Sequence, residues 1–271
     1  MEGVGDVTTA DALSSYRGRR VLVTGHSGFK GTWLSSWLAD LGADVTGFSL
    51  PPDLDPTNVA ASAELGRRIS ETFGDVREAD SVFAVFEAVQ PEIVIHMAAQ
   101  ALVRPSYVDP VGTMSTNVMG AVNVLEAVRR TPSVRAIVSV ASDKCYENPD
   151  DGRAHKETDP MGGSDPYSAS KGAAEIVTTS YRKSFFSDPS GALLASVRAG
   201  NVLGAGDASE DRIIPDVIRT IRSGGAIVLR NPTAVRPWQH VLEPIRAYLL
   251  LGASLLAGDR SKTGSWNIGP T

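Results

Sequence analysis

The segment Arg20-Val-Leu-Val-Thr-Gly-His-Ser-Gly-Phe-Lys-Gly31 decides the fold. Its first five residues form a short apolar, β-branched run that is typical of a buried parallel strand. Three glycines follow at a spacing of three, and the apolar residues after them recur with helical spacing: Trp33, Leu34, Trp37, Leu38 and Leu41. Strand, glycine turn and helix in this order predict the first unit of an α/β domain.

Further apolar runs alternate with helical patterns along the chain. Strands are predicted over 44–50, 92–96, 136–140 and 194–197. Helical spacing joins Val82 to Val89 and Val118 to Val128. This alternation predicts a doubly wound parallel sheet, a Rossmann-type α/β fold, with right-handed crossovers.

The glycine turn has the residues of a dinucleotide-binding loop. Glycines allow a sharp turn and a close approach of the backbone to a pyrophosphate, and the following helix offers free amides at its N-terminus. A glycine turn without a ligand is the alternative, but it would not explain why Asp75-Val76 and Ala98-Ala99 also fall at carboxyl ends of the expected sheet, where a dinucleotide would lie. The cofactor-binding residues predicted here are Gly25, Ser27, Gly28, Phe29, Lys30, Gly31, Asp75, Val76, Ala98 and Ala99, and Tyr167 and Lys171 farther along the chain are expected to contact the cofactor as well.

The end of the second predicted strand bears on the choice of cofactor. An acidic residue there would bind the ribose hydroxyls of NAD, and an arginine would hold the 2′-phosphate of NADP. The segment Gly47-Phe-Ser-Leu50 offers only Ser49, which we include among the cofactor-binding residues. NAD is the expected cofactor, on weak support from these residues.

The pattern divides the chain into three parts. Residues 1–17 form a polar leader that is predicted to be disordered, 18–200 an NAD-binding Rossmann domain, and 201–271 a smaller substrate-binding region. In this last region we expect a helix over 213–223, a strand over 226–229, a helix around Leu249 and a further strand near Trp266.

Composition excludes several classes of protein. The 271 residues carry a formal charge of −5, which argues against a binder of nucleic-acid backbones. Cys145 is the single cysteine, so no internal disulfide can form, and the four histidines lack metal-ligand spacing. No secretion signal precedes residue 20, and the longest apolar run, 248–257, is too short to cross a bilayer. We therefore expect a cytoplasmic protein without a metal or a membrane partner.

A serine, a tyrosine and a lysine supply the chemistry of alcohol oxidation. Tyr167 and Lys171 are four residues apart, so on a helix they share one face. The ammonium group and a cationic nicotinamide should lower the pKa of the tyrosine, so that it can take a proton from a substrate hydroxyl. Ser142, at the end of a predicted strand, would hydrogen-bond the same oxygen.

Motifs spread over nearly the whole chain resemble one family. The sequence is similar to the extended short-chain dehydrogenases, and among them to the nucleotide-sugar 4,6-dehydratases. The resemblance is carried by the segments 24–31, 101–107, 142–148, 159–163, 165–171, 198–207 and 234–240.

The resemblance implies a reaction in three steps. Oxidation at carbon 4 of the sugar gives a ketone, the carbon 6 hydroxyl then leaves as water, and the hydride returns to carbon 6. In the family's pattern Asp143 stands where the acid for the departing hydroxyl is found, and Lys144 where the base for the carbon 5 hydrogen is found. Related dTDP-glucose dehydratases carry a glutamate at the position of Lys144. An ion pair between Asp143 and Lys144 in a surface turn is the alternative.

The resemblance also implies the substrate end of the site. Arg212 and Arg236 match the family's phosphate-contacting positions, with Asn201 alongside. Family members continue beyond the segment that matches 267–270, so we expect part of the substrate-binding region to be absent. They commonly pair through the helices that match 117–129 and 167–186, which implies a homodimer.

Two other functions remain open on the sequence. A nucleotide-sugar 4-epimerase would share the glycine loop and the tyrosine-lysine pair, but would not need Asp143 and Lys144. A cofactor-sensing protein that has lost catalysis would not need Ser142, Tyr167 and Lys171. Formation of a 4-keto-6-deoxy sugar separates both from the dehydratase.

Overall fold

A seven-stranded parallel sheet forms the centre of the molecule. The computed structural model describes residues 9–52, 65–148, 152–188, 191–229 and 232–270, and the strands within them are ordered β3-β2-β1-β4-β5-β6-β9. Their bounds are β1 (Arg20–Thr24), β2 (Asp44–Ser49), β3 (Ser70–Phe73), β4 (Ile93–His96), β5 (Ala136–Ser142), β6 (Leu193–Ala199) and β9 (Gly264–Ile268). The strand order reverses between β1 and β4, which confirms the predicted doubly wound sheet. In sheets of this kind, ligands bind outside the carboxyl ends of the strands at such a reversal.

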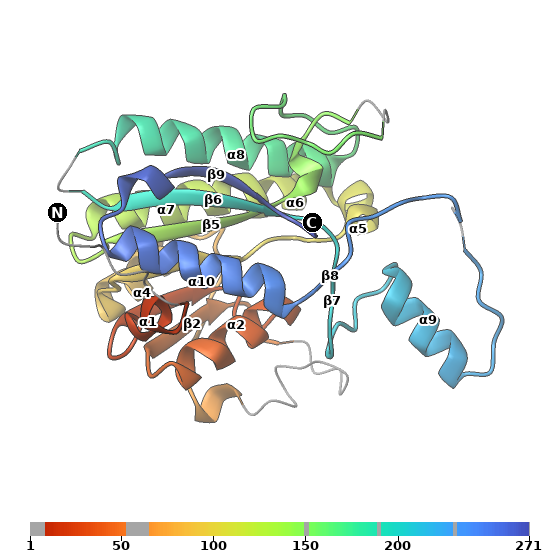
Figure 1. Ribbon diagram of the computed structural model, residues 1–271, viewed down its shortest axis with the longest axis horizontal. Helices are drawn as coiled ribbons and strands as arrows, with labels where there is room; N and C mark the ends of the chain where they lie inside the picture. Colours follow the sequence, from red (N-terminus) through yellow and green to blue (C-terminus); the bar gives the residue numbers. More distant parts are fainter. Residues whose placement is uncertain (1–8, 53–64, 149–151, 189–190, 230–231, 271) are drawn as a thin grey trace, which may run out of the picture.

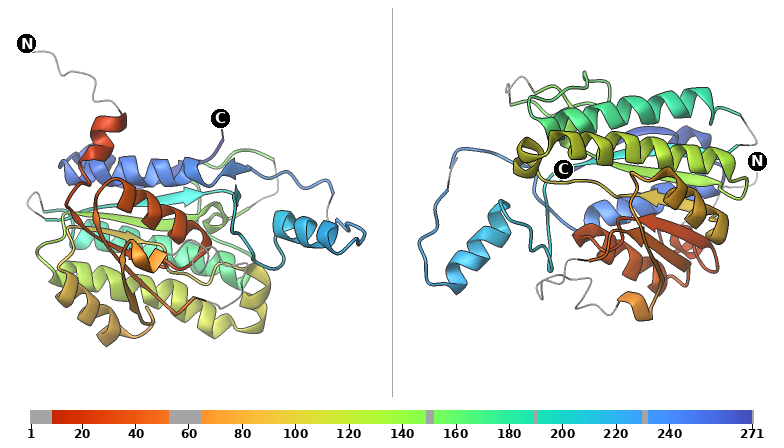
Figure 2. Two further views of the ribbon diagram at one scale, coloured as in Figure 1. Left: turned by 90° about the horizontal axis from the view of Figure 1, so that it is seen from below. Right: turned by 180° about the vertical axis from the view of Figure 1, so that it is seen from behind.

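Helices cover both faces of the sheet (Figures 1 and 2). One face carries α1 (Thr9–Ser14), α2 (Phe29–Asp40) and α10 (Leu242–Leu256), and the other carries α4 (Ala79–Val89), α7 (Gly120–Arg130) and α8 (Pro166–Ser184). Side chains alternate along β1, so that Val21 and Val23 join the core under α2 and α10, whereas Leu22 joins the core under α4 and α7. Two buried faces explain why the strands read as continuous apolar runs.

Shorter elements complete this part of the fold. The helices α5 (Val103–Val108) and α6 (Pro110–Met114) and a π-helical turn (Ser115–Met119) lead from β4 into α7. Turns of 3₁₀ helix lie at Leu65–Arg67, Asp143–Cys145 and Arg260–Lys262. Of the described helices, none combines the length and the apolar character that crossing a membrane requires.

The segment between β6 and α10 extends away from the sheet. Strands β7 (Val202–Leu203) and β8 (Gln239–His240) pair in parallel at its base, and α9 (Ile213–Arg222) stands apart from the sheet in Figure 1. The strand predicted over 226–229 is wrong, because the side chains of Ile227, Val228 and Leu229 are exposed and no neighbouring strand pairs with them in the described residues. After this excursion, α10 and β9 return to the main sheet and pack as part of it.

The leader contains ordered structure that its polar sequence does not predict. Residues 9–14 form α1, and the side chains of Leu13 and Tyr16 are buried in the core with α10. The Tyr16 hydroxyl donates a hydrogen bond of 2.9 Å to the backbone oxygen of Leu249. The prediction of disorder over 1–17 is therefore wrong for residues 9–17, and residues 1–8 lie outside the described part of the chain.

Candidate active site

The glycine turn between β1 and α2 is built as the sequence predicts. Gly25 has a φ of +76°, and a Cβ there would lie 2.7 Å from the backbone nitrogen of Ala98. A Cβ on Gly31 would lie 2.0 Å from the backbone oxygen of Gly25, so α2 can approach the turn only without a side chain. Gly28 caps α2 in an extended conformation and supplies no side-chain hydrogen bond. The amides of the first turn of α2 are therefore left for another acceptor.

Gly28 and Gly31 should respond differently to alanine. Gly28 has a φ of −78°, and a Cβ would come no closer than 3.5 Å to any neighbour, so Gly28→Ala should fold normally but hold a pyrophosphate less closely. Gly31→Ala forces the backbone apart and should cost about 1–3 kcal/mol of stability. Thermal unfolding and NAD titration of both variants check this. An unstable Gly28→Ala variant, or full NAD affinity in it, would contradict the assignment.

Other side chains order the ends of the neighbouring strands. The hydroxyl of Thr24 lies 2.7 Å from Nδ1 of His96 and accepts hydrogen bonds from the amides of Met97 and Ala98. Ser49 donates a hydrogen bond of 2.8 Å to the hydroxyl of Ser27, which joins the end of β2 to the glycine turn. These contacts fix the crevice between β1, β2 and β4.

Asp75 and Val76 follow the end of β3, and the side chains of both contact other residues of the protein. The Arg77 guanidinium donates hydrogen bonds to the Asp75 carboxylate and holds the pKa of that carboxyl below its usual range. The side chain of Val76 is buried and packs where a Cβ on Gly120 of α7 would be. Asp75 keeps acceptor capacity for an adenine amino group, whereas Val76 serves mainly as packing.

The glycine turn and these strand ends fit a dinucleotide. The backbone of the turn comes close without side chains, the first turn of α2 offers amides, and Ser27 and Ser49 offer hydroxyls at the end of β2. No acidic or basic side chain stands beside Ser49 in 47–50 to select for or against a 2′-phosphate.

A cavity of about 920 Å³ opens beside the dinucleotide crevice, between the sheet and the excursion that carries α9. Its lining includes these predicted site residues: Phe29, Lys30, Ala99, Ser142, Asp143, Lys144, Tyr167, Lys171, Asn201, Arg212 and Arg236. The predicted residues outside this lining lie in the glycine turn, in the first turn of α2, or at or after the ends of β2, β3 and β4: Gly25, Ser27, Gly28, Gly31, Ser49, Asp75, Val76 and Ala98. The structure thus gathers the groups predicted for chemistry and for substrate at one place.

A tight turn at the end of β5 presents the first set of these groups. Ser142 ends the strand, donates a hydrogen bond of 3.0 Å to the Asp143 carboxylate and accepts one of 3.3 Å from the Lys144 amide. Asp143, Lys144 and Cys145 form the 3₁₀ turn that follows. The Asp143 carboxylate is therefore directed by Ser142. Cys145 is buried, and burial raises the pKa of its thiol to about 12, so its side chain serves as packing and not as a nucleophile.

Helix α8 presents the second set. Asp165 caps it by accepting a hydrogen bond of 2.9 Å from the Ser168 amide, and Pro166 occupies its first turn. The Ser106 hydroxyl accepts a hydrogen bond of 3.1 Å from the Tyr167 amide. Tyr167 and Lys171 both line the cavity, one helical turn apart, as their spacing predicts.

Burial is the main cause of the pKa shifts of Tyr167 and Lys171. Burial raises the pKa of Tyr167 to about 12, although a hydrogen bond with Ser142 opposes the shift. The sequence predicts a downward shift of this pKa from two charges, the Lys171 ammonium and a cationic nicotinamide. In the protein alone the shift is upward, because burial of the phenol outweighs the effects that lower its pKa. Burial lowers the pKa of Lys171 to about 8, against the opposing charge of Glu175. At neutral pH, Lys171 therefore remains mainly an ammonium group.

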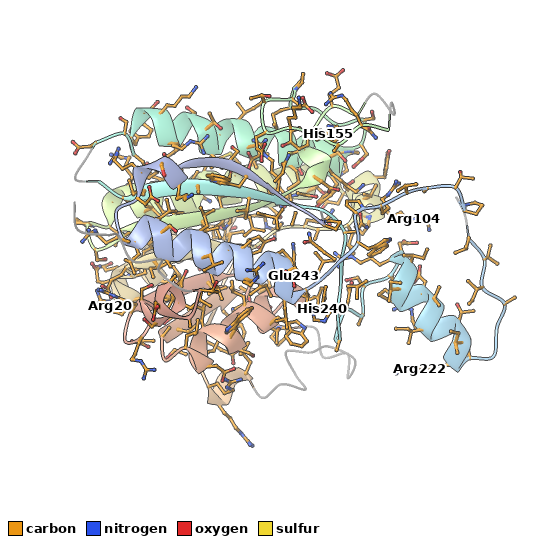
Figure 3. All side chains as sticks on the ribbon, viewed as in Figure 1. Arg20, Arg104, His155, Arg222, His240 and Glu243 are labelled. Carbon is orange, nitrogen blue, oxygen red and sulfur yellow. The ribbon has the colours of Figure 1, made fainter. Side chains whose placement is uncertain are left out.

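Lys30 and Arg104 also bring positive charge to the cavity. The sequence did not predict either residue for the substrate side of the site. The Lys30 ammonium lines it, and burial, with the charges of Lys171 and Arg212, lowers its pKa to about 8. Arg104 on α5 lines it too and forms an ion pair of 3.0 Å with Asp211; Figure 3 shows Arg104 on the side of the sheet from which the excursion leaves. The only sequence signal for Arg104 was its place in the family segment 101–107.

The predicted phosphate-binding arginines lie on the excursion. Arg212, at the N-terminus of α9, forms an ion pair of 3.0 Å with Asp207, and Arg236 donates a hydrogen bond of 2.7 Å to the backbone oxygen of Val235. Both side chains line the cavity. Among the residues that the structure describes, no cluster of three or more acidic, histidine or cysteine side chains could hold a metal ion.

Comparison with known proteins gives consistent results. The model of the NAD dependent epimerase/dehydratase family matches residues 21–269. The CDP-glucose 4,6-dehydratase of Salmonella typhimurium is 45% identical over 259 residues, which cover 94% of this chain and 72% of that protein.

Solved structures agree with this relationship. The UDP-glucose 4-epimerase of Thermus thermophilus in complex with NAD superposes with a TM-score of 0.77 at 28% identity, covering 92% of this chain and 77% of that one. The dTDP-glucose 4,6-dehydratase of Streptomyces venezuelae with NAD bound gives a TM-score of 0.77 at 25% identity, covering 92% and 75%.

Proposed function

The chain belongs to the NAD dependent epimerase/dehydratase family, and we propose that it converts CDP-glucose to CDP-4-keto-6-deoxyglucose. One observation carries the proposal: Ser142, Asp143 and Lys144 line the same cavity as Tyr167 and Lys171. Oxidation of an alcohol needs Ser142, Tyr167 and Lys171. Asp143 and Lys144 supply the acid and base that a water elimination needs in addition.

The cofactor is NAD, which the solved relatives from Thermus thermophilus and Streptomyces venezuelae contain. In this chain the amides at the start of α2 would hold its pyrophosphate, Ser49 its adenosine ribose and Asp75 its adenine. When bound, NAD accepts the hydride that leaves carbon 4 of the sugar and gives it back at carbon 6.

Tyr167 acts first. Its phenolate takes the proton of the carbon 4 hydroxyl, and the Ser142 hydroxyl hydrogen-bonds the same oxygen as the carbonyl forms. The pKa of about 12 that burial gives the phenol must fall for this step, and the Lys171 ammonium provides an opposite charge on the same helix face. Lys171 would thus favour the phenolate form of Tyr167 by its positive charge.

Asp143 and Lys144 act second. The new ketone acidifies the hydrogen on carbon 5, which the neutral amine of Lys144 takes as a proton to become an ammonium. The protonated carboxyl of Asp143 gives its proton to the hydroxyl that leaves carbon 6 as water, and becomes a carboxylate. The hydrogen bond from Ser142 to Asp143 ties the oxidation and elimination groups together in one turn. Return of the hydride to carbon 6 and of a proton to carbon 5 completes a reaction with no net consumption of cofactor.

A panel of nucleotide sugars tests this function. We expect purified protein with NAD to release a 4-keto-6-deoxy sugar from CDP-glucose, and to do so faster than from dTDP-glucose or UDP-glucose. The product is identified by mass spectrometry and by proton NMR of its carbon 6 methyl group. Formation of CDP-galactose instead would favour a 4-epimerase, and recovery of unchanged sugar would favour a cofactor-binding protein.

Arg236 should contribute to substrate affinity and not to cofactor binding. A hydrogen bond to a charged group contributes about 1.5–3 kcal/mol, so Arg236→Ala should raise KM for CDP-glucose about 10- to 100-fold. NAD content should stay at the wild-type level. Arg222→Ala is the control, because Arg222 is exposed on α9 and does not line the cavity (Figure 3). An unchanged KM for the Arg236 variant would remove this side chain from the site.

We also propose that the chain forms a homodimer through α7 and α8. Exposed apolar side chains support this, because Met119 precedes α7 and is 49% exposed, and Ile176 on α8 is 60% exposed. Ile176→Asp should shift the protein from dimer to monomer in analytical ultracentrifugation. Ile221→Asp on α9 is the control and should leave the dimer intact. A monomeric wild-type protein would rule the proposal out.

A further inference from the structure

A buried ion pair lies behind the cavity, between the catalytic helix and the sheet. Glu175 follows Lys171 by one turn on α8, and Arg198 lies on β6; their side chains are 2% and 4% exposed. Arg198 Nε donates a hydrogen bond of 2.8 Å to Glu175 Oε2, and Nη2 donates to the same oxygen. The hydroxyl of Ser196 donates to this carboxylate oxygen as well, at 3.0 Å.

Such a pair is a poor source of stability. Taking each charge out of water costs several kcal/mol, which the attraction between them offsets only when the geometry is good and the remaining groups are hydrogen-bonded. Apolar side chains of similar volume often stabilise a fold as well or better. The use of charged groups here therefore points to a role in orienting neighbouring side chains, because the planar guanidinium fixes the directions of its hydrogen bonds.

The guanidinium extends from this pair to the segment that follows the elimination turn. Arg198 Nη1 donates a hydrogen bond of 2.7 Å to the hydroxyl of Tyr146, which is two residues beyond Lys144. The Tyr146 hydroxyl in turn donates one of 2.6 Å to Oδ1 of Asn267 on β9. The Tyr146 hydroxyl is thus linked to α8 through Arg198 and to β9 through Asn267. Both links hold the residue that directly follows the turn of Asp143 to Cys145.

The loop that precedes α8 closes around the same tyrosine. The His155 ring stacks on the Tyr146 ring at 4.6 Å between centroids and 14° between planes; Figure 3 shows His155 in the loop near α8. Asn267 Nδ2 donates a hydrogen bond of 2.9 Å to the backbone oxygen of His155, and the Asn267 amide donates one of 2.8 Å to Glu157. The tyrosine is therefore held both on its ring face and at its hydroxyl.

We propose that Glu175, Arg198, Tyr146 and Asn267 form a positioning network that fixes the Asp143–Lys144 turn relative to Tyr167. This inference rests on the proposed dehydratase function. Tyr167 has anchors of its own, because its amide is held by Ser106 and α8 is capped by Asp165. The network holds the far side of the turn, together with the hydrogen bond of 2.9 Å that the Gly162 amide donates to the backbone oxygen of Cys145. Loss of the network should therefore impair water elimination much more than alcohol oxidation.

Tyr146→Phe tests the network with little change in shape. It removes the hydroxyl and two hydrogen bonds but keeps the ring that stacks on His155. A small misplacement of reacting groups can cost about 100-fold, so we expect elimination to slow by about 10- to 100-fold. In a single turnover with CDP-glucose, the bound cofactor should become reduced at the wild-type rate and stay reduced for longer. KM for CDP-glucose and NAD content should not change.

Two further variants make the test decisive. Tyr181→Phe removes a hydroxyl elsewhere on α8, from a ring that contacts Phe185 and Phe186, and should leave both phases at the wild-type rate. Asn267→Ala keeps Tyr146 and Arg198 and should also prolong the reduced phase, so the proposal stays testable if Tyr146→Phe is unstable in thermal unfolding. Equal slowing of both phases, or no change in either, would overturn the network. A wild-type protein whose cofactor is never reduced by CDP-glucose would instead overturn the proposed function.

Discussion

Tyr167→Phe is expected to lower kcat with CDP-glucose by about 10²- to 10⁴-fold, the contribution that a positioned general base makes to proton transfer. The variant keeps the aromatic ring in the cavity but has no oxygen to accept the carbon 4 hydroxyl proton. Since oxidation comes first, the bound cofactor should not become reduced when substrate is added. Stopped-flow absorbance of the reduced nicotinamide measures this directly.

The structure suggests that Tyr167→Phe should fold normally. The two hydrogen bonds that anchor the start of α8, from the Tyr167 amide to Ser106 and from the Ser168 amide to Asp165, involve backbone amides and not the phenol. NAD content and the midpoint of thermal unfolding should therefore match those of the wild type. Cofactor reduction at the wild-type rate in this variant would show that another group takes the proton.

Lys144→Ala should separate the two halves of the reaction. Tyr167, Lys171 and Ser142 remain, so CDP-glucose should still reduce the bound cofactor. Without the base for the carbon 5 hydrogen, product formation should fall by about 10²- to 10⁴-fold and the cofactor should stay reduced. Single-turnover absorbance together with mass spectrometry of the released sugar checks both statements.

Lys183→Ala is the matched control for this substitution. Lys183 lies in the last turn of α8, is exposed and does not line the cavity, so its loss should change neither phase. Full dehydration by Lys144→Ala would assign the base to another group. The Lys30 ammonium, which lines the same cavity, would then be the first side chain to substitute.

The sequence predicts the sheet best where the signals are local. Each inner strand is a short apolar run buried on both faces, and the glycines at 28 and 31 face the backbone of the turn itself, although Gly25 faces Ala98 after β4. β3 was missed because its residues, Ser70 to Phe73, are exposed and of mixed polarity. The strand predicted over 226–229 is wrong because a strand needs a partner as well as apolar residues. The run has the composition of a strand, but within the described residues no neighbouring strand pairs with it.

Long-range contacts account for what could not be predicted. Helix α1 is stabilised by Leu13 and Tyr16 packing against α10, more than 230 residues away in sequence, and nothing in the polar leader signals that partner. The same is true of the pair between Glu175 and Arg198, which only the packing of α8 on β6 brings together. Motifs identified Ser142, Asp143 and Tyr167, whereas the groups that hold them in place became visible only in the fold.

In the proposed reaction, one cavity carries out oxidation, elimination and hydride return on a single sugar. CDP-glucose labelled with deuterium at carbon 4 tests it most directly. We expect the product to be CDP-4-keto-6-deoxyglucose with the deuterium on carbon 6, as shown by NMR and mass spectrometry, while the supply of NAD is not consumed. Recovery of sugar that keeps the deuterium on carbon 4, as glucose or as its 4-epimer, would contradict the account.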